Sequence, residues 1–120
     1  MRAMKTRLLV TGGAGFLGNH LLRRANRFVA AGTLHATPST SLPGVTFYVC
    51  DLQSFEEVRV LMDRVQPDVI IHTACSEQGN GLEAILPAAG LLAMQSVERN
   101  IRFIHLSTDQ VFDGTSAPYT

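Results

Sequence analysis

The feature that most constrains the fold is a glycine-rich segment at residues 11–18, TGGAGFLG, with Gly12, Gly15 and Gly18 three residues apart. An apolar run, RLLVT at residues 7–11, predicts a buried strand before it, and residues 16–27 have the apolar periodicity of a helix. Glycine permits a sharp turn between the two and lets a phosphate approach the backbone at the helix N-terminus. The segment therefore predicts a dinucleotide site, with a glycine turn used only for packing as the alternative.

The rest of the chain alternates between predicted strands and helices. Strands are expected at residues 28–34, 45–50, 68–73 and 101–106, and helices at residues 55–65 and 82–99. Ser54 and Glu57 form a capping-box pattern at the start of the helix 55–65, and Pro67 ends that helix. Apolar strands alternating with amphipathic helices predict a parallel sheet covered on both faces. We expect one α/β domain over residues 1–120, a Rossmann-type doubly wound sheet in strand order 3-2-1-4-5 that is truncated after the fifth strand.

Charge and composition exclude some partners. Ten basic and ten acidic residues give a net charge of zero, so no overall field attracts nucleic acid or a membrane. No signal peptide and no apolar stretch of about 18 residues is apparent. Two cysteines without a zinc pattern suit reduced thiols in the cytoplasm. The first 50 residues contain six basic residues and no acidic one. This bias favours an anionic ligand, or it reflects only a solvated basic face. The basic residues are Arg2, Lys5, Arg7, Arg23, Arg24 and Arg27.

The cofactor preference depends on an acidic residue that the sequence lacks. Sites for NAD hold the ribose 2′-hydroxyl with an acid about 20 residues after the glycines, whereas the first acid here is Asp51. Its absence removes a repulsion against a 2′-phosphate, which favours NADP(H) and leaves NAD(H) possible. Arg24, His35, Thr37 and Ser39 are candidate donors to that phosphate, although each also suits an ordinary polar surface.

Several residues at predicted strand ends have two interpretations. Asp51 follows the strand 45–50, where it could accept from an adenine amino group or serve as a turn carboxylate before the next helix. His72 and Cys75 are too few to form a ligand set, so we predict no metal site and place both in the core or along a cleft. His105 is interpreted as a satisfied structural histidine in the fifth strand.

Four segments together resemble the extended short-chain dehydrogenase/reductases. They are TGGAGFLG at 11–18, CDL at 50–52, PDVIIHTA at 67–74 and HLSTDQVFDG at 105–114. More narrowly, STDQVFDGTSAPYT at 107–120 is similar to the dTDP-4-dehydrorhamnose reductases and related sugar-nucleotide reductases. The resemblance covers essentially the whole chain and implies reduction of a 4-keto nucleotide sugar by NAD(P)H.

The resemblance also implies roles for individual residues. Thr108, with Ser107 beside it, would hydrogen-bond the sugar carbonyl oxygen, where negative charge builds up during reduction. Asp51 and Leu52 would border the adenine, and Ala74 and Cys75 would line the cofactor cleft. The pyrophosphate would be held by the three glycines and two neighbouring backbone groups: Gly12, Gly15, Phe16, Leu17 and Gly18.

The sequence departs from that family in ways that limit what it should do alone. The tyrosine acid and the lysine three residues later are absent, so we expect the N-terminal part of a longer enzyme that binds cofactor without turnover. Proteins similar to these reductases also act as non-catalytic regulatory subunits of methionine adenosyltransferase, which is the first alternative. The second alternative is a nucleotide-sugar epimerase or dehydratase. A bare edge on the fifth strand predicts a homodimer or aggregation.

Overall fold

The computed structural model describes residues 5–13, 15–34, 42–73 and 81–106. Within these residues, eight elements follow one another: β1 (Arg7–Thr11), α1 (Phe16–Arg23), β2 (Val29–Leu34), β3 (Val45–Val49), α2 (Phe55–Val65), β4 (Val69–His72), α3 (Gly81–Arg99) and β5 (Arg102–His105). The strands form one sheet in the order β3-β2-β1-β4-β5, with every neighbouring pair parallel. The predicted doubly wound architecture and its strand order are confirmed.

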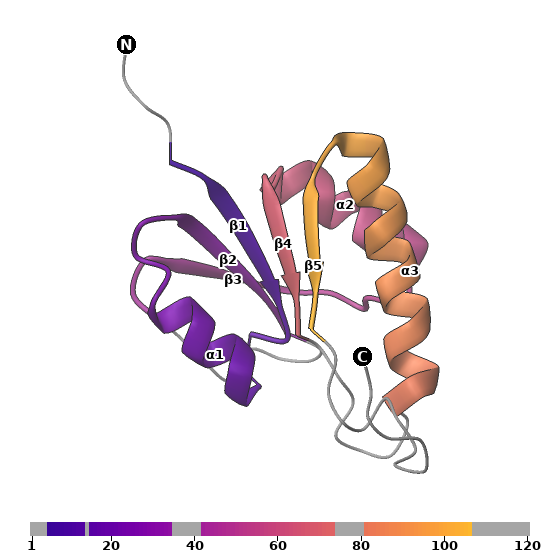
Figure 1. The fold of residues 1–120 in the computed structure, drawn as a ribbon, viewed down its shortest axis with the longest axis horizontal. Helices are drawn as coiled ribbons and strands as arrows, with labels where there is room; N and C mark the ends of the chain where they lie inside the picture. The colour runs from indigo at the N-terminus through magenta and orange to yellow at the C-terminus, as the bar shows by residue number, and fades with distance from the viewer. Residues whose placement is uncertain (1–4, 14, 35–41, 74–80, 107–120) are drawn as a thin grey trace, which may run out of the picture.

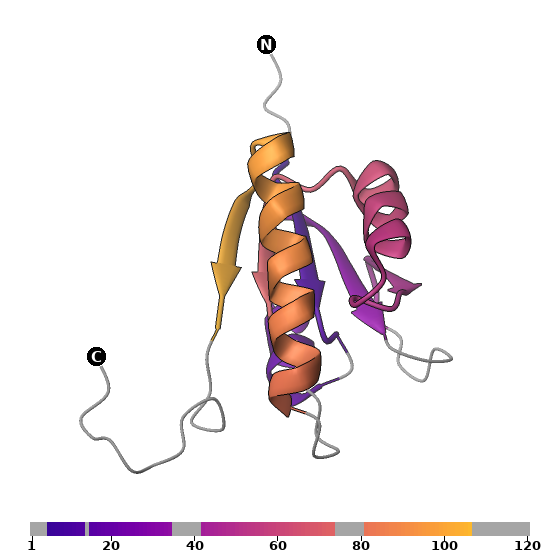
Figure 2. The same cartoon turned by 90° about the vertical axis from the view of Figure 1, so that its right-hand side faces the viewer.

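The helices cover both faces of this sheet, with α1 on one side and α2 and α3 on the other (Figures 1 and 2). The alternation along β1 explains the two layers, because Leu8 and Val10 face α1 whereas Leu9 faces α2 and α3. One cluster includes Leu22 and Ala25 of α1. The larger cluster joins α2 and α3 to the central strands through Val58, Leu61, Met62, Val65, Ile70 and Leu92. Because all neighbouring strands are parallel, their carboxyl ends lie at one edge of the sheet (Figure 1).

The ends of α1 and α2 show how local sequence sets their length. Helix α2 begins at the predicted cap, where Ser54 Oγ accepts from the Glu57 N–H at 3.3 Å. It ends at Val65, and the C-cap residue Gln66 has a left-handed φ of 48°. Helix α1 ends at Arg23 rather than at the predicted residue 27, because the Arg24 N–H turns back to the Leu21 carbonyl at 3.1 Å. That tighter turn brings the chain back to β2.

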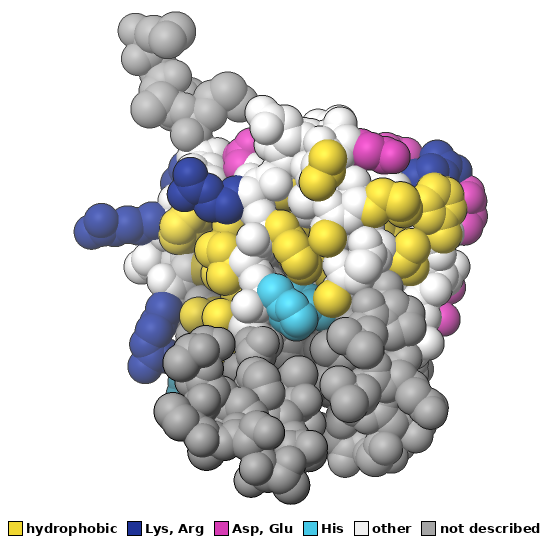
Figure 3. All heavy atoms as spheres, turned by 45° about the vertical axis from the view of Figure 1, so that its right-hand side comes forward, with side chains coloured by type: hydrophobic (Ala, Val, Ile, Leu, Met, Phe, Trp, Pro, Cys, Tyr) yellow, Lys and Arg dark blue, Asp and Glu magenta, His cyan; other side chains and the backbone are white. Residues whose placement is uncertain are grey.

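Two side-chain expectations need correction. The apolar periodicity of the predicted helix 16–27 includes Leu17 and would bury it, but Leu17 is 44% exposed, because it lies in the first turn of α1. His105 is exposed, since it lies on the edge strand β5. Ile104 and Leu106 are exposed beside it, and hydrophobic side chains lie next to histidine on this face (Figure 3). The predicted edge at β5 is therefore present in the described sheet.

In the part of the chain that the structure describes, no helix combines the length and the apolar character needed to cross a membrane.

Candidate functional site

The turn between β1 and α1 is built from backbone contacts that require glycine. Gly12 has a φ of 72°, in the left-handed region that few other residues adopt. The Gly15 N–H donates to the Gly12 carbonyl at 3.0 Å and closes the turn just before α1. The predicted sharp bend therefore starts at the first glycine of the motif.

Gly18 and Gly15 serve this turn in different ways. A Cβ on Gly18 would stand 2.1 Å from the Gly12 carbonyl oxygen and 3.0 Å from Thr73 Oγ1. Glycine at this position therefore lets α1 pack closely against the ends of β1 and β4. Among the described residues, a Cβ on Gly15 would approach only the Gly12 oxygen, at 3.3 Å.

The backbone N–H groups of the turn fall into two sets. Gly12 and Gly13 donate to Thr33, the former to its Oγ1 at 3.2 Å and the latter to its carbonyl oxygen at 2.8 Å. The first N–H groups of a helix have no partner within it, and the N-cap Gly15 supplies no side-chain acceptor. The N–H groups of Phe16 and Leu17 therefore lie without a partner within the helix, at the positive end of its dipole. The first turn of α1 carries no acid, so the geometry suits an anion such as a pyrophosphate.

Asp51 and Leu52 lie at the end of β3, on the same edge of the sheet as the glycine turn. The Asp51 carboxylate accepts from the Gln53 N–H at 3.0 Å, which is the turn role that the sequence left open. Its other predicted role, accepting from an adenine, stays a prediction. Leu52 is half-buried and packs against the core next to α2 and α3.

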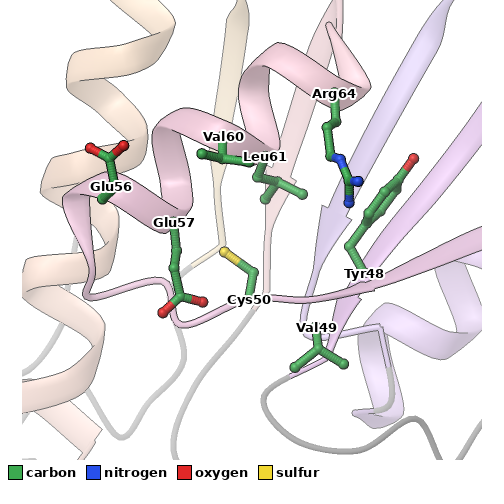
Figure 4. Close-up of a pocket in the computed structure, with 8 residues that line it drawn as sticks. All are labelled: Tyr48, Val49, Cys50, Glu56, Glu57, Val60, Leu61 and Arg64. Atoms are coloured by element: carbon green, nitrogen blue, oxygen red, sulfur yellow. The ribbon is translucent and has the colours of Figure 1, made fainter.

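A shallow pocket beside Asp51 has a different character (Figure 4). It lies between β3 and α2 and is lined by Tyr48, Val49, Cys50, Glu56, Glu57, Val60, Leu61 and Arg64. Burial, and then the negative charges of Glu57 and Asp51, raise the pKa of the Cys50 thiol to about 11. Cys50 therefore stays protonated and unreactive at neutral pH. With two carboxylates in its wall, the pocket does not suit a phosphate.

The buried histidine His72 ties the ends of β1 and β4 together. Its Nδ1 lies 2.7 Å from Thr11 Oγ1, which also accepts from the Thr73 N–H at 3.0 Å. Burial, and then the neighbouring His105, lower the pKa of His72 to about 4, so its imidazole is neutral at physiological pH. His72 Nε2 is buried with no hydrogen-bond partner among the described residues. The prediction of a core position for His72 is confirmed, since the residue is 1% exposed.

The structure brings together part of the predicted site. The three glycines and the backbone of Phe16 and Leu17 lie together where β1 meets α1, with Gly18 buried, and Asp51 and Leu52 lie two strands away on the same edge. Other predicted residues lie outside the described residues: His35, Thr37, Ser39, Ala74, Cys75, Ser107 and Thr108.

Thr33 is a site residue that the sequence reasoning missed. Its contacts with Gly12 and Gly13 place it directly beside the glycine turn, at the carboxyl end of β2. The signal that could have found it is its distance of 21 residues from Gly12. The fingerprint of a dinucleotide site predicts an acid rather than a threonine at this spacing.

Comparisons with known proteins agree with this geometry. Residues 6–120 match the family model described as the RmlD substrate binding domain. The chain is 36% identical, over 97% of its length, to a dTDP-4-keto-6-deoxy-D-glucose reductase of Streptomyces niveus, of which it spans 40%. It is 31% identical, over 95% of its length, to the methionine adenosyltransferase 2 subunit beta of Rattus norvegicus, of which it spans 36%.

A solved structure shares the fold. The enzyme WbmG of Bordetella bronchiseptica, crystallised in complex with NAD, superposes with a TM-score of 0.79 at 16% identity. The match covers 98% of this chain and 46% of WbmG.

Proposed function

The chain belongs to the RmlD substrate binding domain family, and from that premise we propose that it forms the cofactor-binding part of an NAD(P)H-dependent reductase of 4-keto nucleotide sugars. The observation that carries this proposal is the uncapped N-terminus of α1 beneath the glycine turn. There the N–H groups of Phe16 and Leu17 have no partner within the helix, and the first turn carries no acid. A pyrophosphate fits this surface because its two negative charges would meet the helix dipole and unused donors.

The cofactor supplies a hydride to the sugar carbonyl when it is bound. The glycine turn of this chain would hold the diphosphate, and Asp51 would accept from the adenine amino group. Thr108, with Ser107, would donate a hydrogen bond to the carbonyl oxygen of the sugar and stabilise the charge that develops there. Ala74 and Cys75 would line the cleft between these two ends.

NADP(H) is the favoured cofactor in this proposal. No acid occurs before Asp51, so no carboxylate of the first 50 residues opposes a 2′-phosphate. NAD(H) is the alternative, and the crystal structure of WbmG with NAD supports it at the level of the shared fold.

The test is a calorimetric titration of the 120-residue chain with NADPH and, separately, with NADH. We expect saturable 1:1 binding of at least one of the two. Addition of dTDP-4-keto-6-deoxyglucose should give no loss of absorbance from the reduced nicotinamide. In similar reductases a tyrosine donates the proton and a lysine three residues later lowers the pKa of that tyrosine, and this sequence contains no such pair. Absence of dinucleotide binding would refute the proposal. Turnover by this chain alone would refute the part of the proposal in which the chain binds the cofactor but does not catalyse the reaction by itself.

A second function is favoured by the similarity to the beta subunit of methionine adenosyltransferase 2. In that case the same dinucleotide site would belong to a regulatory module rather than to an enzyme. A stable complex between this chain and a methionine adenosyltransferase catalytic subunit in size-exclusion chromatography would favour the module.

A further inference from the structure

The last residues of β1, β4 and β5 form one row across the sheet. Thr11 is the register partner of His72, and His72 is the register partner of His105. The chain continues from this row into the three segments to which the proposed function assigns the diphosphate, the cofactor cleft and the sugar carbonyl. These segments are the glycine turn after β1, residues from Ala74 after β4, and residues from Ser107 after β5. Contacts within the row therefore set where these segments leave the sheet.

Hydrogen bonds through the Thr11 side chain join the ends of β1 and β4. His72 Nδ1 lies 2.7 Å from Thr11 Oγ1, which also accepts from the Thr73 N–H at 3.0 Å. Thr73 Oγ1 in turn donates to the Thr11 carbonyl oxygen at 2.5 Å. Thr11 and His72 are both buried, so water cannot replace a partner that is removed. The imidazole is thus part of the network that fixes the spacing of the two strand ends.

The same network contacts the glycine turn at both of its ends. Gly12 follows Thr11 directly and has the left-handed φ at which the turn begins. Thr73 Oγ1 lies 3.0 Å from the position that a Cβ on Gly18 would occupy, so it packs against α1 where the glycine motif ends. A shift of Thr11 or Thr73 would therefore displace the turn relative to the N-terminus of α1.

The ring of His72 is also packed against two rings of β5. It stacks on Phe103, with centroids 6.2 Å apart, and is tilted by 40° against His105 at 5.1 Å. The imidazole is neutral at physiological pH, because burial and the neighbouring His105 lower its pKa to about 4. An uncharged ring of similar size can therefore preserve this packing while it removes the hydrogen bond to Thr11.

We infer that His72 is a positioning residue of the dinucleotide site: through Thr11 and Thr73 it holds the ends of β1 and β4 at the spacing at which the glycine turn accepts a diphosphate. The inference rests on the proposed function, since it presupposes a dinucleotide at the turn. His72 acts through Thr11 and is not itself a ligand of the cofactor. Because the diphosphate is common to NADPH and NADH, loss of this role weakens both dinucleotides by the same factor.

The experiment compares the dissociation constants of NADPH and NADH for the 120-residue chain and three variants at pH 8. His72→Asn places an amide atom where Nδ1 stands, so it can keep the bond to Thr11. His72→Gln places its amide near the position of Nε2, and His72→Phe keeps only the ring. We expect His72→Gln and His72→Phe to bind both dinucleotides at least about tenfold more weakly, the effect of one lost buried hydrogen bond. His72→Asn should stay within about threefold of the unaltered chain.

Met62→Ala is the control for a general loss of stability. Met62 is fully buried in the larger cluster and lies in the last turn of α2, which leads into the amino end of β4, away from the carboxyl edge. Urea unfolding should show that it destabilises the fold at least as much as the His72 variants. Its affinity for both dinucleotides should nevertheless stay within about twofold, because distant sites contribute independently.

Three outcomes would overturn the inference. They are unchanged binding in His72→Phe and His72→Gln, an equal loss in His72→Asn and His72→Phe, and a loss in Met62→Ala as large as in His72→Phe. If His72→Phe and His72→Gln do not fold by circular dichroism, Thr11→Val removes the same bond from its other side and Thr11→Ser keeps it. A loss of affinity in Thr11→Val alone then supports the inference, and equal binding by these two variants overturns it. Binding of neither dinucleotide by the unaltered chain refutes the proposed function itself.

Discussion

The N-termini of α1 and α2 lie at the same edge of the sheet but are built in opposite ways. Helix α1 starts after Gly15, which offers no side-chain cap, and its first turn contains no acid. Helix α2 starts after Ser54, whose Oγ accepts from the Glu57 N–H, and its first turn carries Glu56 and Glu57. The Glu57 carboxylate also accepts from the Asp51 N–H at 3.1 Å.

This difference shows where the chain leaves room for a ligand. At α2 the Ser54 side chain already accepts from one of the terminal N–H groups, and Glu56 and Glu57 place negative charge at the positive end of the dipole. At α1 those interactions are missing, and a cap of the Ser54 type would stabilise a helix by about 1 kcal/mol. A bound anion could take the place of that cap, so the less stable helix end is the one suited to function.

The largest effect is expected from a change in the close packing of α1 against the glycine turn, because this packing positions the uncapped N-terminus of α1. Gly18→Ala places a Cβ 2.1 Å from the Gly12 carbonyl oxygen, a backbone atom that cannot move without displacing the turn. We expect it to lower the free energy of unfolding by about 3 kcal/mol or more and to abolish dinucleotide binding. Urea unfolding and calorimetric titration measure the two effects.

Gly90→Ala is the matched control for that substitution. Gly90 lies within α3, and a Cβ there would meet no atom within 4 Å. The same chemical change should therefore raise the free energy of unfolding by about 0.5–1 kcal/mol, from helix propensity alone, and leave binding unchanged. If Gly18→Ala behaved like Gly90→Ala, the close approach of α1 to β1 would not be required for the site.

A second substitution converts the open helix end into one that resembles α2. Gly15 has a φ of −72°, which any residue adopts, so Gly15→Asp can supply both a cap and a negative charge. We expect the helix to gain a few tenths of a kcal/mol, and the affinity for NADPH to fall about 100-fold because the carboxylate repels the diphosphate. Thermal unfolding and NADPH titration should thus move in opposite directions.

Gly15→Ala separates charge from bulk in this experiment. It adds the same Cβ, 3.3 Å from the Gly12 carbonyl oxygen, but no carboxylate. Its effect on NADPH affinity should be much smaller than that of Gly15→Asp. An equal loss in both variants would mean that the space before Gly15, rather than the charge at the helix end, governs binding.

The contrast between the two helix ends also explains what the sequence could predict. The Ser54 and Glu57 pattern and the spacing of Gly12, Gly15 and Gly18 depend on local backbone geometry, so both helix starts were predicted correctly. The end of α1 was not, because the return to β2 is set by packing between elements. Thr33 was missed for a related reason, since its hydroxyl acquires a role only when β2 lies beside the glycine turn.

The smallest expected effect comes from removing the cap of the closed helix end. Ser54→Ala loses the hydrogen bond from the Glu57 N–H to Ser54 Oγ, so the free energy of unfolding should fall by about 1 kcal/mol. NADPH affinity should stay within about twofold, because α2 takes no part in holding the diphosphate and independent sites contribute additively. Urea unfolding with and without NADPH measures both quantities. A loss of affinity as large as that of Gly15→Asp would show that the two helix ends act on one ligand, and the division between an open and a closed terminus would fail.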